Sequence, residues 1–278
     1  MLTVKNGEKT IKDSINSVLN QSVKPGLICI IDDGSIDSTP KILDKLQREN
    51  GSVLHIISLP DSGYDIRRIA HNWNKACDYV KSKNVDYDYL LIIADDIILP
   101  KEYIEKLGLE MKKDSKLVVV SGSRGLESSD DVSLPEGAGR IIDMKFFGAL
   151  GLRHPPYYGY EPWILFKALQ LGYKIKKFES IKYEHKRVFG TKHNFVEYGP
   201  AMRCLGYHPI FVIARVLRNI FSNKSGISKL TSLKMIFDYL NKKKWENDPY
   251  FKYFEPELRH FIRTFQKNRL YLKLKFNH

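Results

Sequence analysis

Two adjacent carboxylates, Asp95 and Asp96, directly follow an almost wholly apolar run from Tyr89 to Ala94. Such a run predicts a strand that is buried on both faces, and in open α/β sheets ligands collect outside the carboxyl ends of strands. Paired acids there are unfavourable without a positive partner. Their hard oxygen atoms suit Mg²⁺ or Mn²⁺ held jointly with a substrate diphosphate. The alternative is an Asp that caps a helix beginning near Pro100, but it leaves the second acid unexplained.

Alternating helical and strand patterns place this strand in a larger sheet. Apolar spacing predicts helices over residues 8–21, 38–49, 65–81 and 101–112, and strands over residues 27–31, 53–59, 89–94 and 117–121. The repeated order predicts a Rossmann-like α/β fold, in which helices cover both faces of a mostly parallel sheet. Residues 122–145 are interpreted as loops, residues 162–172 as a short helix, and the chain beyond residue 200 as helical. Residues 1–4 are short for a central strand, so we expect a truncated first strand or a true start further upstream.

The overall composition restricts the class of protein. The three cysteines, Cys29, Cys77 and Cys204, are scattered, so neither a disulfide framework nor a zinc-binding spacing is present. This pattern, without a signal peptide or an apolar run long enough to span a bilayer, predicts a cytoplasmic location.

Positive charge is concentrated in the rear of the chain. Residues 174–278 carry 23 Lys and Arg against 8 Asp and Glu, a net charge of +15, whereas the first 173 residues carry −2. This asymmetry indicates an anionic partner, which is a membrane surface, a nucleic acid or an acidic substrate. A solvated basic surface is the alternative.

Three segments together resemble the opening of family 2 glycosyltransferases: Val4–Ile11, Ser14–Ser22 and Ile30–Thr39. The resemblance extends over about residues 1–190. It implies a GT-A fold, a nucleoside diphosphate sugar as donor (UDP-linked rather than GDP-linked) and usually an inverting hexosyltransferase mechanism. We therefore expect a catalytic domain over residues 1–200, with a nucleotide-sugar half (1–121) and an acceptor half (122–200). A basic helical extension would cover residues 201–278.

The resemblance also assigns residues that bind the nucleotide. Val4, Lys5 and Asn6 match the stretch that lines the base and ribose pocket, and Asp33 matches the acid at the nucleobase edge, where a charge-assisted hydrogen bond forms. An Asx-type turn in the segment 32–34 is an alternative for this acid, although two aspartates allow both roles.

An arginine pair, Arg67 and Arg68, lies where the family places an arginine against the nucleotide. A guanidinium group suits phosphate or base recognition. Which of the two points inward is left open, and a solvated arginine is the alternative.

Asp95 and Asp96 match the position of the family's DXD-type motif. The resemblance assigns Asp95 to the ribose or to metal-bound water, and Asp96 to direct coordination of Mn²⁺ or Mg²⁺. Ile93 occupies the position of the first acid in the commonest form of this motif. His185 follows a strand where many members carry a histidine near the diphosphate. It is expected to bind the metal or donate to phosphate, with a structural or acceptor-facing role as the alternative.

Glu161 matches the family's proposed catalytic base, which takes a proton from the acceptor hydroxyl. Tyr160 replaces the acid that usually precedes it. The alternative for Glu161 is a purely electrostatic role at a helix N-terminus.

The rear of the chain contains an amphipathic segment over residues 208–221, in which Arg215 and Arg218 lie beside aliphatic residues. This segment is typical of a helix at a membrane interface or of one packed on the catalytic domain. The sequence therefore predicts an acceptor that is a lipid-linked or cell-envelope glycan, and an enzyme peripheral on the inner face of the cell membrane. The alternatives are an inactive glycosyltransferase-like scaffold, since acids are missing at Ile93 and Tyr160, and a basic nucleic-acid-binding protein. Without a nucleic-acid motif, no nucleic-acid partner is expected.

Overall fold

The computed structural model describes residues 1–124, 134–187, 195, 197–221 and 227–276. Packing divides these residues into two units. The first unit comprises residues 1–124, 134–154 and 172–187, and the second comprises residues 155–171 with the described residues beyond 194. The boundary expected at residue 200 stays a prediction.

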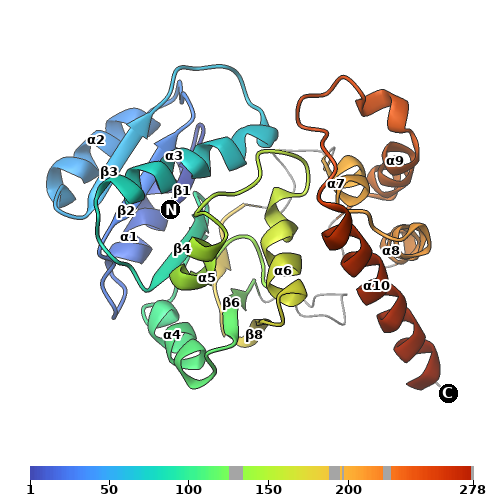
Figure 1. Ribbon diagram of the computed structural model, residues 1–278. Coiled ribbons are helices and arrows are strands. Elements are labelled where there is room, and N and C mark those ends of the chain that lie inside the picture. Colours follow the sequence, from blue (N-terminus) through green and yellow to red (C-terminus); the bar gives the residue numbers. More distant parts are fainter. Residues whose placement is uncertain (125–133, 188–194, 196, 222–226, 277–278) are drawn as a thin grey trace. The chain divides into compact units, whose positions relative to one another are not determined.

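The first unit is built on a seven-stranded sheet with the order β3-β2-β1-β4-β7-β6-β8 (Figure 1). Its strands are β1 (Leu2–Val4), β2 (Ile28–Asp32), β3 (Leu54–Ser58), β4 (Tyr89–Ala94), β6 (Leu117–Ser123), β7 (Arg140–Asp143) and β8 (Lys174–Lys182). Only β7, among these strands, runs antiparallel to its neighbours. A small antiparallel pair joins β5 (Ile97–Ile98) to β9 (Glu184–His185). The strand order reverses between β1 and β4, where such sheets bind ligands.

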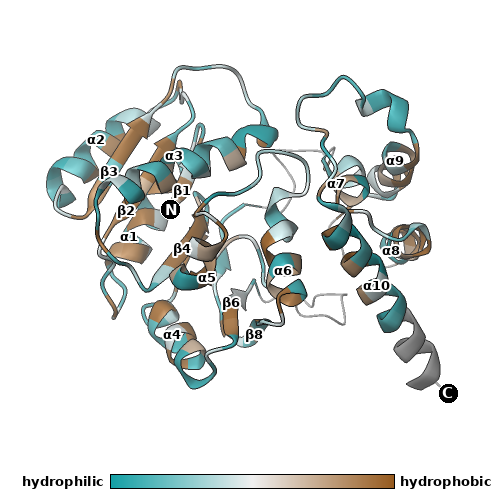
Figure 2. Ribbon diagram, in the orientation of Figure 1, coloured by the Kyte–Doolittle hydropathy of each residue, from teal (hydrophilic) through white to brown (hydrophobic). Residues whose placement is uncertain are grey.

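Helices cover both faces of the sheet, as the sequence predicts. Alternate residues of β2 show this division: Ile28 and Ile30 belong to a core with α1 (Ile11–Leu19), α2 (Thr39–Asn50) and α4 (Tyr103–Lys113). Cys29 and Ile31 pack with α3 (Ile69–Ser82) on the other face. A short 3₁₀ turn, η1 (Ile66–Arg68), precedes α3, and α5 (Met144–Ala149) contacts β7. In Figure 2 the hydrophobic colouring concentrates along the strands.

The interpretation of residues 122–145 as loops was wrong for residues 122–123, which end β6, for residues 144–145, which begin α5, and for residues 140–143, which form β7. This strand has only two consecutive aliphatic residues, Ile141 and Ile142, too few for a recognisable strand pattern. It is nevertheless buried between β4 and β6.

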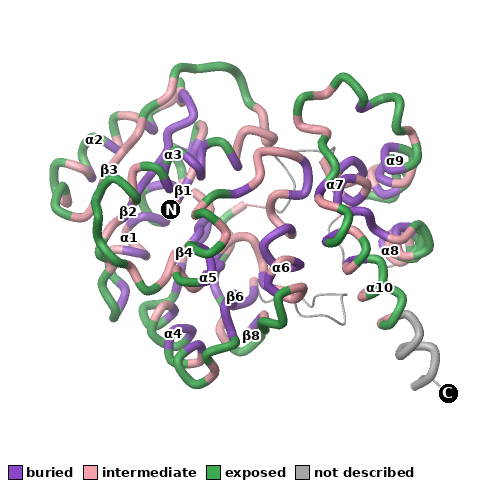
Figure 3. Tube along the Cα trace, viewed as in Figure 1, coloured by how far each residue is buried: buried purple, intermediate pink, exposed green. Residues whose placement is uncertain are grey.

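The second unit is helical over its described residues, as expected. It contains α6 (Tyr160–Gln170), α7 (Tyr198–Cys204), α8 (Pro209–Phe221), α9 (Lys229–Leu240), η2 (Lys242–Trp245) and α10 (Pro256–Phe276). Helix α6 packs against α10, where Phe166 meets Phe265 edge to face. Helix α9 packs against both α7 and α8, and all three helices carry buried positions (Figure 3). Among the described residues, no helix combines the length and the hydropathy needed to cross a bilayer.

Candidate active site

The carboxyl ends of β1, β2 and β4 meet at one edge of the sheet. In the strand register, Val4 lies beside Asp32, and Thr3 lies beside Ala94. Residues that follow directly on these strands are therefore neighbours. Gly7 lies so close that an added Cβ atom would stand 2.9 Å from an Asp95 carboxylate oxygen. Any larger residue would crowd that carboxylate, so the close approach explains the glycine.

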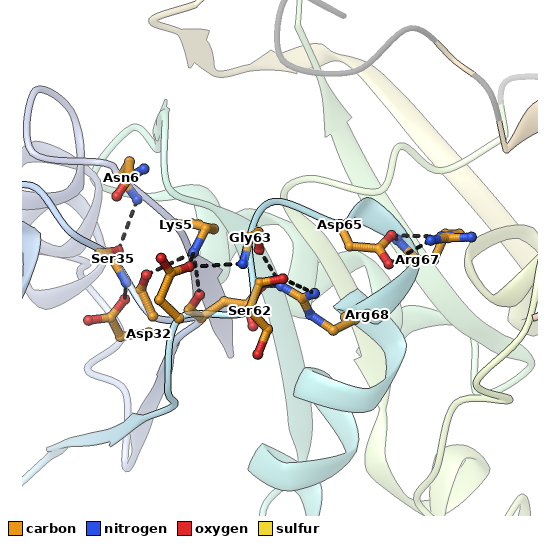
Figure 4. A network of polar contacts seen from close by, with 12 residues as sticks. Lys5, Asn6, Asp32, Ser35, Ser62, Gly63, Asp65, Arg67 and Arg68 are labelled. Carbon is orange, nitrogen blue, oxygen red and sulfur yellow. Dashed lines mark hydrogen bonds and ion pairs between the residues drawn. The ribbon is translucent and has the colours of Figure 1, made fainter.

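Lys5 and Asn6 hold the loop after β2 against the end of β1 (Figure 4). The Lys5 ammonium group donates to the backbone oxygens of Asp33 (3.0 Å) and Gly34 (2.8 Å) and to the Asp61 carboxylate (2.6 Å). The Asn6 side-chain oxygen accepts from the backbone N–H of Ile36 at 2.9 Å. Both side chains therefore shape the loop that carries Asp33.

The two neighbouring aspartates after β2 have separate roles. Asp32 accepts a hydrogen bond from the backbone N–H of Ser35 at 3.0 Å, so this side chain stabilises the turn after β2. The Asp33 carboxylate instead pairs with the Arg68 guanidinium at 3.0 Å, with side chains 10% and 21% exposed. Asp33 is thus held at the edge of the sheet by its ion pair with Arg68.

Arg67 and Arg68 make different contacts, and only Arg68 turns toward Asp33. Arg68 pairs with Asp33 and donates to the backbone oxygen of Gly63. Arg67 turns to Asp65, which caps η1 and also accepts from the Arg67 backbone N–H (Figure 4). Arg68 is therefore the better candidate for contact with a nucleotide.

Asp95 and Asp96 share one cation, Arg187. The guanidinium lies 2.5 Å from an Asp95 oxygen and 2.7 Å from an Asp96 oxygen, and the three side chains are 23%, 16% and 10% exposed. Burial lowers the pKa of Arg187, but the two carboxylates raise it by more, so its pKa lies above the ordinary value. Helix α4 begins at Tyr103 after Glu102, so neither aspartate caps it.

His185 lies beside this cluster, with Nδ1 3.8 Å from an Asp96 oxygen and 2.6 Å from the backbone oxygen of Arg187. A carbonyl oxygen only accepts, so Nδ1 carries the hydrogen and Nε2 of the neutral ring keeps its lone pair. This is the arrangement usual for histidines that bind metals.

The donor atoms fit a divalent ion in type but do not form a complete cage. Among the described residues, no three His, Cys, Asp or Glu side chains are grouped as a metal site. Mg²⁺ is commonly bound by one or two carboxylates together with substrate phosphates. Asp95 and Asp96 offer the two carboxylates of such a shared site, provided that Arg187 moves from them, and His185 lies beside Asp96.

Helix α1 fixes the segment that carries the two acids. The Ser14 hydroxyl donates to the backbone oxygen of Ala94 at 2.9 Å, and the Ser17 hydroxyl accepts from the N–H of Leu99 at 3.2 Å. Gln21 donates to the backbone oxygen of Pro100 at 2.9 Å. The polar residues of the segment 14–22 therefore position the loop after β4.

Glu161 belongs to the second unit, whereas the other candidate residues belong to the first. It lies in the first turn of α6, which begins two residues before the predicted start at Pro162. Gly159 precedes the helix with φ +92°, and an added Cβ there would stand 2.9 Å from Leu205. The glycine thus allows the sharp turn that presents Glu161 at the start of the helix.

The sequence of residues 1–158, more than half of the chain, matches the description "Glycosyl transferase family 2". The chain belongs to this family. Among curated proteins, the poly-beta-1,6-N-acetyl-D-glucosamine synthase of Staphylococcus aureus is 24% identical over 151 residues, which are 54% of this chain. The match spans about a third (33%) of that synthase.

Solved structures of glycosyltransferases share the fold. The mannosyltransferase PcManGT from Pyrobaculum calidifontis, in complex with GDP-Man and Mn²⁺, superposes with a TM-score of 0.58 at 13% identity. The match covers 86% of this chain and 69% of PcManGT. S. aureus TarS 1-349 in complex with UDP-GlcNAc has a TM-score of 0.50 at 17% identity, with 86% of this chain and 70% of that TarS chain covered.

The expected family and GT-A fold are thus confirmed, while the roles of the individual site residues stay predictions. One member of the site, Arg187, was not identified from the sequence. It lies more than 90 residues from the acids that it pairs with, and only its position two residues after His185 suggests a role.

We expect that Arg68→Ala weakens the binding of nucleoside diphosphates about ten- to hundredfold, since a hydrogen bond to a charged group contributes about 1.5–3 kcal/mol. Arg67→Ala is the matched control and is expected to change affinity less than threefold, because Arg67 pairs with Asp65. Titration calorimetry with UDP measures both. An equal loss in the two variants would contradict the assignment of Arg68.

Proposed function

We propose that this protein of glycosyl transferase family 2 moves a sugar from a nucleoside diphosphate sugar to an acceptor hydroxyl, with inversion at the anomeric carbon. The observation that carries the proposal is that two charged pairs lie at the carboxyl-end edge of the sheet, one after β2 and one after β4, on either side of β1. Asp33 with Arg68 offers charge-assisted hydrogen bonds to a base, and Asp95 with Asp96 offers hard oxygen ligands near a diphosphate. Both ends of a nucleotide diphosphate are thereby recognised along one edge.

The proposed donor is UDP-linked in preference to GDP-linked. TarS, with UDP-GlcNAc bound, supports this choice. PcManGT, with GDP-Man and Mn²⁺ bound, supports the use of a divalent ion and makes a GDP-linked sugar the alternative donor. Val4, Lys5 and Asn6 would line the base and ribose pocket, with Asp95 near the ribose or metal-bound water.

In the transfer step, Glu161 would accept the proton of the acceptor hydroxyl as its oxygen attacks the anomeric carbon. The bond from that carbon to the diphosphate breaks, and the nucleoside diphosphate leaves. A divalent ion (Mn²⁺ or Mg²⁺), when bound, neutralises the charge on the leaving diphosphate. Asp96, Asp95 and His185 would hold that ion.

The proposed acceptor is a lipid-linked or cell-envelope glycan, with the protein peripheral on the inner face of the cell membrane. The similarity to a poly-beta-1,6-N-acetyl-D-glucosamine synthase supports an envelope glycan. The basic charge of residues 174–278 supports a location beside anionic lipid.

An inactive glycosyltransferase-like scaffold is the second candidate function. Two positions that are commonly acidic carry Ile93 and Tyr160, and Arg187 already forms ion pairs with both acids of the pair. A scaffold of this kind would bind nucleotide without turning over a donor.

A nucleotide-sugar panel tests the proposal. With Mn²⁺, a UDP-sugar at about 100 times its Kd is expected to stabilise the fold by about 2.7 kcal/mol, which raises the thermal midpoint by several degrees. EDTA should remove most of this shift. Release of UDP without acceptor distinguishes the enzyme from a scaffold, because a scaffold would show the thermal shift and no release. If no nucleotide sugar shifts the midpoint, the proposed donor class is wrong.

A further inference from the structure

Helices α8 and α9 each leave a row of large apolar side chains exposed. On α8 the exposed residues follow a spacing of three or four, which places them on one side: Ile210 (60%), Ile213 (44%), Leu217 (48%) and Phe221 (83%). On α9 the same spacing gives Leu230 (80%), Leu233 (51%), Phe237 (59%) and Leu240 (62%). We call these eight residues the exposed apolar rows.

The opposite sides of the two helices face the interior of the second unit. Val212 and Val216 of α8 are buried, as are Met235 and Tyr239 of α9. The Tyr239 hydroxyl donates to the backbone oxygen of Tyr207 at 2.8 Å, which fixes the orientation of α9. The exposed apolar rows therefore point away from the unit and are not needed for its core.

Basic residues accompany the exposed apolar rows, and acids are almost absent. Lys229 and Lys234 are exposed on α9, and three further lysines follow in η2. Between residues 209 and 245 the sequence contains one acid, Asp238. That acid is buried (1% exposed) and paired with Lys244 at 2.6 Å, so it offers no negative charge to the surface.

The expected role of Arg215 and Arg218 at this surface needs revision. Both side chains are half-buried, and Arg215 lies over the ring of Tyr198 with 5.7 Å to the ring centroid. Arg215 thus packs on Tyr198 within the second unit, and the exposed lysines are better placed than Arg215 to meet an external partner.

We propose that α8 and α9 together form a docking surface for an anionic lipid bilayer. The exposed apolar rows would enter the headgroup boundary, and the lysines would reach the anionic headgroups with their long stems along the apolar surface. A second copy of the chain fits this surface poorly, because two faces of like charge repel each other. A nucleic acid would meet the lysines but would leave six exposed aliphatic side chains without apolar contact.

The inference rests on the proposed function for its purpose, which is to reach a lipid-linked or envelope acceptor. Vesicle binding, however, requires neither donor nor metal. Vesicle binding without donor turnover would overturn the proposed enzymatic function and support the docking surface. Donor turnover without vesicle binding would support the enzymatic function and overturn the docking surface.

Co-sedimentation of the full chain with vesicles tests the surface. Vesicles of phosphatidylcholine with about 30% phosphatidylglycerol should bind the protein at low salt, and pure phosphatidylcholine should bind it at least about tenfold more weakly. The double variants Leu230→Ser with Phe237→Ser, and Lys229→Glu with Lys234→Glu, should each lower binding about tenfold or more. All four side chains are exposed, so circular dichroism should show an unchanged fold.

Matched controls use exposed residues of the first unit. Val85→Ser with Leu109→Ser removes apolar side chains that are 54% and 52% exposed, and Lys41→Glu with Lys45→Glu reverses two charges on α2. These variants should bind within about twofold of the unaltered protein. Equal losses in controls and test variants would show non-specific attraction and overturn the proposal.

A fluorescent reporter separates insertion from electrostatic contact. Phe237→Trp places an indole at an exposed position of α9, while the native residues Trp73, Trp163 and Trp245 are buried. Its emission should shift to shorter wavelength with anionic vesicles only. Absence of the shift, or of binding at low salt, would overturn the proposal. The proposal would also be overturned if the unaltered protein formed a dimer and the double variant Leu230→Ser with Phe237→Ser were a monomer.

Discussion

Glu161→Gln is expected to lower the rate of sugar transfer by about two to four orders of magnitude, the range typical of general-base removal. The amide is nearly the same size as the carboxylate but accepts no proton at neutral pH. Donor binding should be unchanged, because the nucleotide-binding candidates belong to the other unit. Steady-state kinetics with acceptor, together with calorimetry of the donor complex, measures both quantities.

A matched control tests the electrostatic alternative for Glu161. Glu257 also lies in the first turn of a helix, α10, and Glu257→Gln removes the same charge from a comparable position. Loss of a favourable helix-terminal charge alone is worth about 0.3–1 kcal/mol of stability and should leave the transfer rate intact. If Glu161→Gln also changes only stability, or if it abolishes donor binding while turnover at saturation stays normal, Glu161 is not the base.

The fold was predictable where each element repeats a local pattern. The strand from Tyr89 to Ala94 was expected to be covered on both faces. Strand β4 occupies the middle of the seven-stranded order, although only Ile92 and Ile93 are buried. Parallel strands joined by helices leave long periodic segments, which the spacing of apolar residues reveals. Strand β7 lacks such a segment, and its place between β4 and β6 depends on pairing with residues distant in the sequence.

The candidate site was predictable in its acids but not in its pairings. Asp33 and the two arginines stand in recognisable segments, yet the choice of Arg68 depends on a contact across 35 residues. Arg187 depends on the small sheet of β5 and β9, which brings residues 184–185 beside residues 97–98. The spacing of residues along the sequence carries no information on such long-range contacts. Only the structure therefore shows that Arg187 pairs with Asp95 and Asp96.

In the rear of the chain, the sequence pattern of a single helix also left the side-chain contacts undetermined. The amphipathic pattern of residues 208–221 was compatible with a membrane face or a packed face, and α8 has one side buried in the second unit and one side with exposed apolar residues. Its arginines and its exposed apolar side chains were assigned together from the sequence. The structure separates them, because Arg215 contacts Tyr198 while Phe221 is 83% exposed.

Asp96→Ala is expected to abolish metal-dependent binding of nucleoside diphosphate and to leave the fold intact. The fold should persist because Arg187 keeps its second ion pair, with Asp95, so no buried charge is left alone. Calorimetry with UDP, with and without Mn²⁺, measures the effect. Asp78→Ala is the control, since it removes an exposed ion pair with Arg153 on another part of the first unit. Unchanged Mn²⁺ dependence in Asp96→Ala would show that the acid does not hold the ion.

Removal of the competing cation should act in the opposite direction. Arg187→Met keeps both acids and much of the side-chain volume, and it frees carboxylates that the guanidinium occupies at 2.5 and 2.7 Å. Charge-assisted hydrogen bonds contribute about 1.5–3 kcal/mol, so Mn²⁺ should bind the donor-free variant about tenfold or more tightly than the unaltered protein. Electron paramagnetic resonance of free Mn²⁺ measures this without any turnover. The double variant Asp96→Ala with Arg187→Met should lose the gain, because the freed site then lacks its principal ligand. An affinity for Mn²⁺ that Arg187→Met leaves unchanged or lowers would mean that Arg187 and the metal do not compete for these acids.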